Sequence, residues 1–214
     1  MWLFKGKEIT TPPEDYTGFI YKITLPDKSF YIGKKAFTHK KKTKLIWRGV
    51  STGNPKNISS RFTLVEKWFN KNPNLNIGFS RIVQNKNNYK KYVKNNLTKK
   101  QLLTFKFILS VEGNDKDSGL NWKLNSNSLV LMPKPRVTSW LMETTLIPGF
   151  HYVLLNDDFS DLEEKFKWCK NNPNKCKEII SNANNYMKQF KNKKQEEQLE
   201  KRILNTYFKK IKFE

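Results

Sequence analysis

Short apolar runs alternate with polar or glycine-containing turns and helix-like segments through most of this chain. The pattern recurs three times between Leu109 and Glu164, the stretch around which the other segments are arranged. A repeated order of strand, turn and helix is typical of a parallel sheet covered by helices. Ligands of such sheets bind in the loops that leave the carboxyl ends of the strands. The loop from Glu112 to Gly119, rich in small polar residues, is therefore the first candidate for a binding turn.

Five apolar runs are predicted to form the sheet. They are residues 45–47, 76–83, 105–111, 128–132 and 150–155. The intervening sequence predicts helices with recognisable starts, because Ser, Thr and Asn favour the residue that caps a helix. These helices are expected after a cap within residues 57–60, over 97–103, over 120–124, and from Thr138 or Ser139 through Glu143. The Lys- and Asn-rich residues 85–96 are expected to be a mobile loop.

The C-terminal part of the chain is predicted to be helical. Ser160 and Glu163 have the spacing of a capping box, which we interpret as structural. Pro173 is placed at the first position of the next helix, where its missing N–H costs nothing. A last helix begins at about Gln195. Its apolar residues recur every four positions: Leu199, Ile203, Tyr207 and Ile211.

The N-terminal part has a different pattern. Residues 1–15 are predicted to be a polar lead-in that contains Pro12 and Pro13. Residues 19–24 and 29–32 are β-branched and aromatic runs joined by a turn, so they predict a hairpin.

The charge of the chain has two open interpretations. There are 41 Lys and Arg residues against 19 Asp and Glu, giving a net charge of +22. Such an excess is typical of proteins that bind nucleic acid or another polyanion. However, only five basic residues are Arg, and 36 Lys accompany 24 Asn. Because Lys and Asn increase together in A- and T-rich coding sequences, the charge is equally explained by a Lys-rich solvated surface.

The length, cysteines and hydropathy narrow the class of protein. At 214 residues the chain has room for one domain, or a domain with an appendage. Cys169 and Cys176 are seven positions apart in a helical region, too far for an unstrained disulfide, and are expected to be free thiols. No apolar run approaches the roughly 20 residues that span a bilayer. We therefore expect a soluble, cytoplasmic protein without a membrane span.

The N-terminal hairpin resembles a nuclease family. GFIYKIT at 18–24 and FYIGKK at 30–35 resemble the paired signature of GIY-YIG endonucleases, and MWLFKGKEIT is similar to the lead of phage members. The resemblance implies that Tyr21 and Tyr31 serve near a scissile phosphate, in a DNA-binding protein or nicking endonuclease. It ends near Lys44, before the Arg, metal-binding Glu and Asn that the family also requires. Tyrosine is common in strands, so packing within the hairpin is the alternative.

A second resemblance covers roughly residues 45–190. It is carried by five ordered blocks: IWRGVSTGN at 46–54, RFTLV at 61–65, LSVEGNDKDSGLNWKLNSNSLVLMP at 109–133, SWLMETTLIPGFHYVLLNDDFSDLEEK at 139–165 and WCKNN at 168–172. They resemble the glycosyltransferase family of capsule-associated and protein O-glucosyl- or xylosyltransferases. The resemblance implies the nucleotide-sugar half of a GT-B fold: a Rossmann-like parallel sheet that binds a UDP-sugar, with no essential metal or other cofactor, and transfers the sugar to a glycan or protein hydroxyl.

The chemistry of that role selects the candidate site residues. A diphosphate leaving group carries charge that cationic side chains and backbone donors must neutralise when no metal is used. Arg48, expected in the loop after the first strand, matches the family's WRG block and is the main candidate for this task. Glu143 is placed to accept hydrogen bonds from the donor's hydroxyls. The remaining donor-binding candidates are Thr52, Gly53, Arg61, Asn114, Ser118, Gly119 and Lys123.

Each candidate has a structural alternative. Arg48 and Glu143 are equally consistent with solvated surface positions, and His151 with a strand-end histidine whose hydrogen bond is satisfied. Asp157 and Asp158 precede a helix, where acidic residues are favoured electrostatically.

The predicted organisation has three parts. These are a GIY-YIG-like hairpin segment at residues 1–45, the nucleotide-sugar-binding domain at 46–190 and a C-terminal helix at 191–214. The resemblance implies an acceptor-binding half ahead of the WRG block, which supplies the general base. Only 45 residues precede that block here. We therefore expect a glycosyltransferase with an incomplete acceptor half, which binds donor but transfers sugar poorly, and we assign no catalytic residue.

Overall fold

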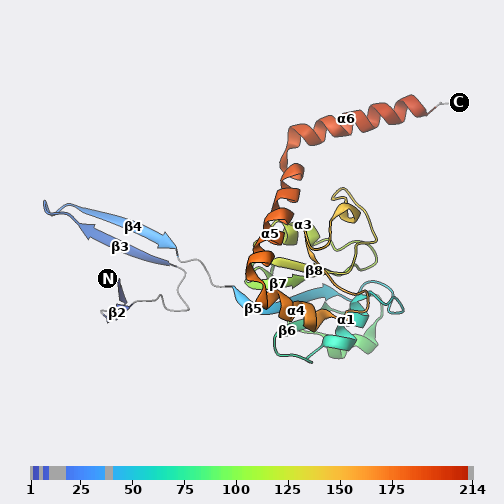
Figure 1. Ribbon diagram of the computed structural model, residues 1–214, viewed down its shortest axis with the longest axis horizontal. Helices are drawn as coiled ribbons and strands as arrows, with labels where there is room; N and C mark the ends of the chain where they lie inside the picture. The colour runs from blue at the N-terminus through green and yellow to red at the C-terminus, as the bar shows by residue number, and fades with distance from the viewer. Residues whose placement is uncertain (1, 5–6, 10–17, 37–40, 212–214) are drawn as a thin grey trace. The chain divides into compact units, whose positions relative to one another are not determined.

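The computed structural model describes residues 2–4, 7–9, 18–36 and 41–211, which form two compact units (Figure 1). Unit 1 spans Met1–Lys41 and unit 2 spans Lys42–Glu214. In unit 1, strand β1 (Trp2–Phe4) pairs antiparallel with β2 (Lys7–Ile9). The sequence did not predict this strand pair within its polar lead-in.

The two aromatic runs of unit 1 also pair. Strand β3 (Gly18–Thr24) pairs antiparallel with β4 (Phe30–Ala36), in a register that joins Gly18 to Ala36 and Thr24 to Phe30. The turn between them is tied by the carboxylate of Asp27, which accepts a hydrogen bond from the amide of Ser29 at 2.9 Å.

Unit 2 contains a parallel sheet of five strands in the order β6-β5-β7-β8-β9. The strands are β5 (Lys42–Val50), β6 (Leu75–Arg81), β7 (Phe105–Leu109), β8 (Leu129–Met132) and β9 (Val153–Leu154). All five predicted strand regions are thus found, and the predicted α/β class with a parallel sheet is confirmed.

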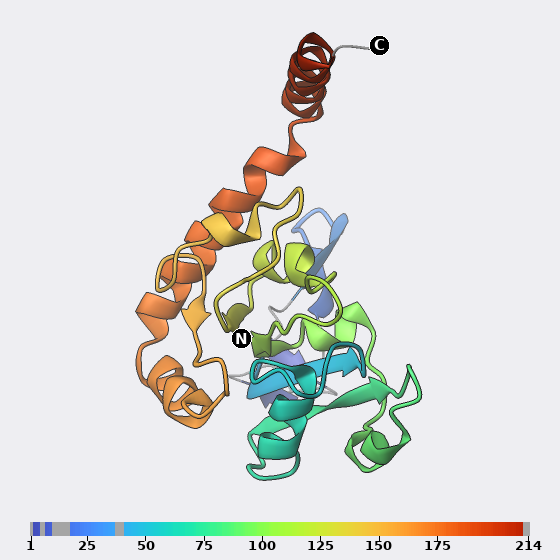
Figure 2. The same cartoon turned by 90° about the vertical axis from the view of Figure 1, so that its right-hand side faces the viewer.

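Helices lie on both faces of this sheet (Figures 1 and 2). The α-helices are α1 (Arg61–Trp68), α2 (Lys99–Leu102), α3 (Leu120–Leu124), α4 (Leu162–Asn171), α5 (Pro173–Lys188) and α6 (Lys193–Lys210). Three 3-10 helices complete the unit: η1 (Asn87–Tyr92), η2 (Glu143–Thr145) and η3 (Gln189–Lys191).

Alternation along β5 explains how one strand supports two cores. Leu45 and Trp47 are buried on one face with Phe62 of α1. Ile46 points to the other face, where Leu102 of α2 and Trp122 of α3 pack beside it. Because successive side chains of a strand point to opposite faces, a central parallel strand needs apolar residues at both parities.

The direction in which the chain adds strands to the sheet changes at β5. From β5 the chain runs outward to β6 and then returns to β7 on the other side of β5. Counted from β5 this is the order 2-1-3-4-5, one of the common doubly wound arrangements. The loops after β5 and β7 therefore diverge, and a crevice is expected at the carboxyl ends of these two strands.

Several helix boundaries agree with their sequence signals. Ser60 caps α1 by accepting a hydrogen bond from the amide of Thr63 at 3.1 Å. Pro173 occupies the first position of α5, as predicted. The last helix begins two residues before the predicted Gln195, and Asn192 caps it.

The helix predicted from Thr138 or Ser139 through Glu143 is wrong. Residues 139–142 form a turn, and Met142 has a left-handed backbone conformation with φ of 54°, which no α-helix accommodates. The carboxylate of Glu143 accepts the Ser139 amide at 2.6 Å, so the residue that was expected inside a helix instead closes the turn. Only η2 follows.

The capping box at Ser160 is also wrong. Asp161 is the residue that precedes α4, and the hydroxyl of Ser160 accepts a hydrogen bond from the side chain of Asn156 at 3.0 Å. Glu163 accepts a hydrogen bond from the side chain of Asn72 instead of returning to the helix start. A tertiary contact has therefore replaced the expected local one.

Two further segments differ from their sequence predictions. The strand expected over 150–155 shortens to β9, because a turn at Gly149, with φ of 73°, places the preceding residues outside the ladder. The expected loop at 85–96 contains η1, whose Tyr89 packs on Phe62 with ring centroids 4.5 Å apart.

The cysteines are free, as predicted, but they lie on two different helices. The Cys176 thiol of α5 donates to the carbonyl of Cys169 in α4 at 3.3 Å, and both residues are buried. Among the described residues, no helix has the length and apolar character needed to cross a membrane.

Candidate functional site

Two pockets lie beside the carboxyl ends of the central strands, and Asp117 lines both of them. The first, which we call the cationic pocket, is bounded by the ends of β5 and β7 and by the start of α3, and its volume is about 270 Å³. The second, which we call the acidic pocket, is bounded by the loops after β7 and β8 and by η2. Its volume is only about 20 Å³. The cationic pocket is at the position where the strand order predicts a crevice, and the acidic pocket adjoins it through Asp117.

Four charged side chains line the cationic pocket. Arg48, Arg61 and Lys123 are positive, and Asp117 is the one carboxylate among them. Two positive charges are therefore left without a negative partner inside the pocket. In a partly water-excluded site, such an excess favours binding of an anion with about two negative charges.

Arg61 links the ends of β5 and β7. It is the first residue of α1 and is buried, and its Nε and Nη2 donate to the carbonyl of Val111 at 3.1 Å each. Its Nη1 donates to the carbonyl of Val50 at 3.1 Å and to Thr52 Oγ1 at 2.7 Å. Burial lowers the pKa of Arg61, and the charge of Asp117 opposes that shift. The guanidinium thus holds the two diverging loops at a fixed separation.

Lys123 and Asp117 form a buried ion pair at the start of α3. The ammonium of Lys123 contacts the Asp117 carboxylate and also donates to the carbonyl of Leu109 at 3.0 Å. Asp117 further accepts hydrogen bonds from Ser110 Oγ at 2.6 Å and from the Gly119 amide at 2.9 Å. Burial alone would raise the pKa of Asp117, but Lys123 and these hydrogen bonds outweigh it and hold the pKa below its usual value.

Arg48 lies within β5, not in the loop after it, which corrects the predicted position. Its Nη1 donates to the carbonyls of Trp47 and Asn76, its Nη2 to the side chain of Asn76, and its Nε to the carbonyl of Asn95. Burial lowers the pKa of Arg48 to about 10, so the side chain stays charged at neutral pH. Four of its five N–H groups are therefore engaged in joining β5 to β6 and to the segment after η1.

Thr52, Gly53 and Asn114 join the loops after β5 and β7. The amide of Gly53 donates to Asn114 Oδ1 at 2.7 Å, and Thr52 Oγ1 accepts from Arg61. Gly53 has a φ of 101°, and a Cβ added at Gly113 would lie 2.4 Å from Thr52 Oγ1. The polar groups predicted to face a ligand therefore bond to other parts of the protein: the Gly53 amide to Asn114, and the Thr52 hydroxyl to Arg61.

Ser118 and Gly119 line the cationic pocket at its mouth. Ser118 is exposed, and among the described residues no partner is recorded for its hydroxyl. The Gly119 amide is already occupied by Asp117. Of the predicted donor-binding residues, Ser118 is thus the one with a hydroxyl free to meet a ligand without breaking an existing bond.

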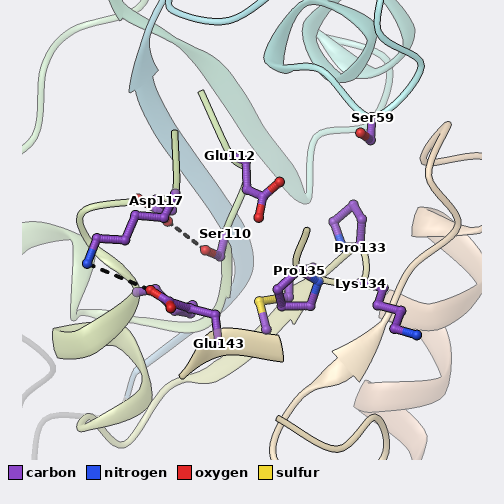
Figure 3. Close-up of a pocket in the computed structure, with 11 residues that line it drawn as sticks. Ser59, Ser110, Glu112, Asp117, Pro133, Lys134, Pro135 and Glu143 are labelled. Carbon is purple, nitrogen blue, oxygen red and sulfur yellow. Dashed lines mark hydrogen bonds and ion pairs between the residues drawn. The ribbon is translucent and has the colours of Figure 1, made fainter. Parts of the chain in front are cut away.

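The acidic pocket brings together carboxylates from two segments, the loop after β7 and η2 (Figure 3). Glu112, Asp117 and Glu143 outnumber Lys116 and Lys134 among its charged residues. Glu143 is 1% exposed and accepts hydrogen bonds from the Ser139 hydroxyl at 2.7 Å as well as from the Ser139 amide. The alternative of a solvated residue is therefore wrong, and the role of Glu143 as an acceptor for the donor's hydroxyls stays a prediction.

Glu112 was not among the predicted site residues. Its Oε1 accepts hydrogen bonds from the amides of Arg136 at 2.9 Å and Val137 at 3.2 Å, which fastens the loop after β8 to the loop after β7. Figure 3 shows Glu112 and Glu143 on different segments, and the carboxylate of Glu143 faces the ammonium of Lys116, 3.7 Å away. The sequence signal that could have identified Glu112 is its position directly after a buried apolar run.

The pocket residues missed by sequence reasoning include Ser110, Glu112, Lys116, Asp117, Trp122 and Lys134. Some of them are held by contacts that only the folded chain makes, such as Ser110 with Asp117 and Lys116 with Ser139.

His151 agrees with its structural interpretation. Its Nδ1 accepts a hydrogen bond from the amide of Ile147 at 2.9 Å, and burial lowers its pKa. Asp157 and Asp158 form ion pairs with Arg136 and Lys67.

The tyrosines of the nuclease hypothesis lie in unit 1. Tyr21 pairs with Gly33, and Tyr31 pairs with Ile23, across β3 and β4. Their proposed role at a phosphate stays a prediction, as does nucleic-acid binding by the Lys-rich surface. Within the described ranges, no three His, Cys, Asp or Glu residues gather in a way that could hold a metal ion.

Comparisons with known proteins connect this geometry to a family. The sequence model of glycosyl transferase family 90 matches residues 27–214. An O-glucosyltransferase LpsA from Dichelobacter nodosus is 39% identical over 150 residues, which are 70% of this chain and 44% of that protein. Uncharacterized protein 179R of Invertebrate iridescent virus 6 is 32% identical over 93 residues, 41% of this chain and 8% of that protein.

One solved structure is also similar. The crystal structure of TarM aligns with 78% of this chain and 36% of its own, with a TM-score of 0.49 and 18% identity. The chain spans less than half the length of each of these relatives.

Proposed function

The chain belongs to glycosyl transferase family 90, and on that premise we propose that unit 2 binds a UDP-sugar for transfer of the sugar to a hydroxyl group of a glycan or protein. The observation that carries this proposal is the excess of two positive charges in the cationic pocket, at the crevice between β5 and β7. The diphosphate of a UDP-sugar has matching charge, and this crevice is where open α/β sheets bind nucleotides.

The volumes of the two pockets indicate which part of the donor each pocket would hold. Pockets that enclose a whole ligand usually measure about 300–1,000 Å³. The cationic pocket, at about 270 Å³, has room for the diphosphate and part of the nucleoside. The acidic pocket, at about 20 Å³, holds little more than one water, so a sugar ring would lie at its mouth and replace that water with its hydroxyls.

The carboxylates of the acidic pocket suit a sugar. A carboxylate accepts several hydrogen bonds, and sugar hydroxyls are donors in the required number. Glu143 and Glu112 each accept bonds from backbone amides, which fix their orientation before a ligand binds. Preorganised acceptors of this kind select a polyhydroxylated ring over the phosphate, which the same carboxylates repel.

The cationic pocket supplies what bond cleavage requires. The acceptor oxygen bonds to the anomeric carbon as the bond from that carbon to the diphosphate oxygen breaks. The electron pair of the broken bond stays with UDP, and the proton of the acceptor hydroxyl passes to a base or to water. Arg61 and Lys123 are held rigidly beside the developing charge and stabilise it without rearrangement. Arg48 contributes its charge from within β5 and adds at most its remaining N–H.

Calorimetry with UDP and UDP-glucose tests the proposal, and glucose is the first sugar to use because the Dichelobacter relative is named an O-glucosyltransferase. Ser118→Glu places a negative charge at the mouth of the cationic pocket, and we expect it to weaken UDP binding by about 1–3 kcal/mol. Ser118→Gln has nearly the same size without the charge and is the matched control, with affinity close to that of the unchanged chain.

Two outcomes would count against the proposal. Absence of UDP binding by folded protein at millimolar nucleotide would remove it altogether. Equal affinities for Ser118→Glu and Ser118→Gln would show that the diphosphate lies elsewhere, because Ser118 is exposed and its substitution does not disturb the buried ion pair behind it.

A further inference from the structure

Helix α6 presents an apolar surface that nothing in the described part of the chain covers. None of its 18 residues is buried. Figures 1 and 2 show that it continues beyond α5 and projects away from the sheet. Five large apolar side chains on it are between 46% and 59% exposed: Leu199, Ile203, Leu204, Tyr207 and Phe208. Because helices gain most of their stability from burying an apolar face, α6 needs a partner surface.

The apolar residues share one side of the helix. At about 100° per residue, the five side chains fall within one half of its circumference. Gln198 and Asn205 lie on the opposite half. The helix is therefore amphipathic in the manner of one that pairs with another helix.

The charges of α6 indicate what that partner is. On the apolar side, Glu196, Glu197 and Glu200 outnumber Lys193 in the first half of the helix, and Lys210 lies at its end. Two copies aligned in parallel would face like charges, whereas two antiparallel copies face opposite ones. We propose that α6 pairs antiparallel with α6 of a second copy of this chain.

The spacing selects a register for the pair. With Ile203 opposite its own counterpart, Glu196 faces Lys210 and Leu199 faces Tyr207 of the second copy. Apolar side chains then meet along the centre, and ion pairs form at both ends. Opposite charges at the ends of a helix pair fix its orientation, while the central contacts provide most of the affinity.

A groove beside α6 continues this surface onto the body of unit 2. The groove measures about 1100 Å³ and is lined by the first half of α6 together with Trp140, Met142 and Phe190. Trp140 is 55% exposed and Met142 is 49% exposed. The second copy's helix would cover these side chains too. Met142 adjoins Glu143, so the interface would also order the turn that forms one wall of the acidic pocket.

Sedimentation of the full chain over a range of concentrations tests the pairing. We expect a reversible dimer that Ile203→Glu weakens at least about tenfold, because two carboxylates would meet at the centre of the apolar contact. Asn205→Glu adds the same charge on the opposite side of the same helix and is the matched control, with dimerisation unchanged. Circular dichroism and UDP binding report whether each variant is folded.

Charge exchange tests the orientation. Glu196→Lys alone and Lys210→Glu alone should each weaken the dimer by roughly threefold to tenfold, since two exposed ion pairs per dimer become repulsive. Combining both substitutions in one chain should restore it. An unchanged chain that stays monomeric at every concentration would overturn the proposal, and so would a dimer that is insensitive to Ile203→Glu or that the combined exchange fails to restore.

Discussion

The cationic and acidic pockets use the same carboxylate, Asp117, but they are built differently. The cationic pocket is made from strand ends that buried side chains tie together, with Arg61 bridging β5 and β7. The acidic pocket is made from loops, and its carboxylates hold backbone amides of the turns around it. A pocket fixed by strands keeps its shape when empty, whereas one closed by turns depends on a few hydrogen bonds.

This difference suits the two parts of the proposed donor. The diphosphate is common to all UDP-sugars, so its pocket benefits from rigidity, because fixed charges stabilise a leaving group without rearrangement. The sugar is the part that differs from one UDP-sugar to another, and turns accept substitutions more readily than strand ends do. The comparison therefore predicts that changes at the cationic pocket affect folding and all nucleotide binding, while changes at the acidic pocket affect sugar selection alone.

The largest effect is expected when Asp117 is replaced by Asn. Lys123 and Asp117 have side chains that are 7% and 12% exposed, so the substitution leaves a buried ammonium without its counter-charge. Removing one partner of a buried pair costs about 3–5 kcal/mol of unfolding free energy. Urea unfolding at neutral pH measures the loss.

Asp157→Asn is the matched control for this substitution. Asp157 pairs with Arg136 at 2.8 Å, but the two side chains are 49% and 44% exposed. A pair of this kind contributes about 0–1 kcal/mol. Similar losses for the two variants would mean that the cationic pocket is not held together by its buried pair.

In the unchanged chain, the contribution of the Lys123–Asp117 pair to the free energy of unfolding should be lost as the pH is lowered. Because the pKa of Asp117 is lower in the folded state, its contribution is complete above the usual carboxyl pKa of about 3.9. It is lost as the pH falls through the folded-state value. Asp117→Asn lacks this term, so the stability difference between the two proteins should shrink in acid.

The fold was predictable from the sequence because its signals are local and repeated. Apolar runs such as 45–47 and 105–111 identify strands by composition alone, and Ser60 identifies a helix start by its side chain. The same reasoning placed Arg48 in a loop because its apolar run ends at Trp47. Pairing with β6, in which Arg48 lies opposite Gly78 and Val50 opposite Arg81, carries β5 on to Val50, and no local pattern records that partner.

The site was predictable only as a region. The candidates Arg61, Ser118, Gly119 and Lys123 do line one pocket, but Thr52, Gly53 and Asn114 use their polar groups on each other's loops. Asp117 was passed over although it lies in the loop chosen as a binding turn. Its importance comes from Lys123 one turn of helix later and from Ser110 at the end of β7, contacts that the folded chain creates.

A second substitution separates the two pockets by ligand. Glu143→Gln keeps the size of the side chain and one acceptor oxygen, but it removes the charge and half of the acceptor capacity. We expect affinity for UDP-glucose to fall by about 1.5–3 kcal/mol, the value of hydrogen bonds to a charged group, and affinity for UDP to stay unchanged. Calorimetry with both ligands gives the two values.

Ser118→Glu provides the contrast for Glu143→Gln, since it should weaken UDP and UDP-glucose alike. Equal losses of both ligands in Glu143→Gln would show that Glu143 contacts the nucleotide or supports the whole site. The assignment of the sugar to the acidic pocket would then be wrong, although the diphosphate assignment would stand.

The smallest expected effect comes from His151, which lies in the turn that follows η2, the 3-10 helix that begins at Glu143. Its Nδ1 accepts the Ile147 amide, so protonation would remove that hydrogen bond, and burial lowers the pKa of the folded state. The stabilisation is therefore present above the unfolded pKa of about 6.5 and is lost as the pH falls. Between about pH 7.5 and 5.5 the loss is at most about 1.4 kcal/mol, because pH 5.5 lies one unit below that pKa.

His151→Asn isolates this effect, because its side-chain oxygen can accept the same amide but does not titrate. The variant should lack the decline in unfolding free energy over this pH range, and in the unchanged chain UDP-glucose binding should weaken with acid more than UDP binding does. The cationic pocket has no histidine among its lining residues, so no corresponding change is expected there. Equal pH dependence of the two ligands would show that the turns around the acidic pocket are as firmly fixed as the strand ends.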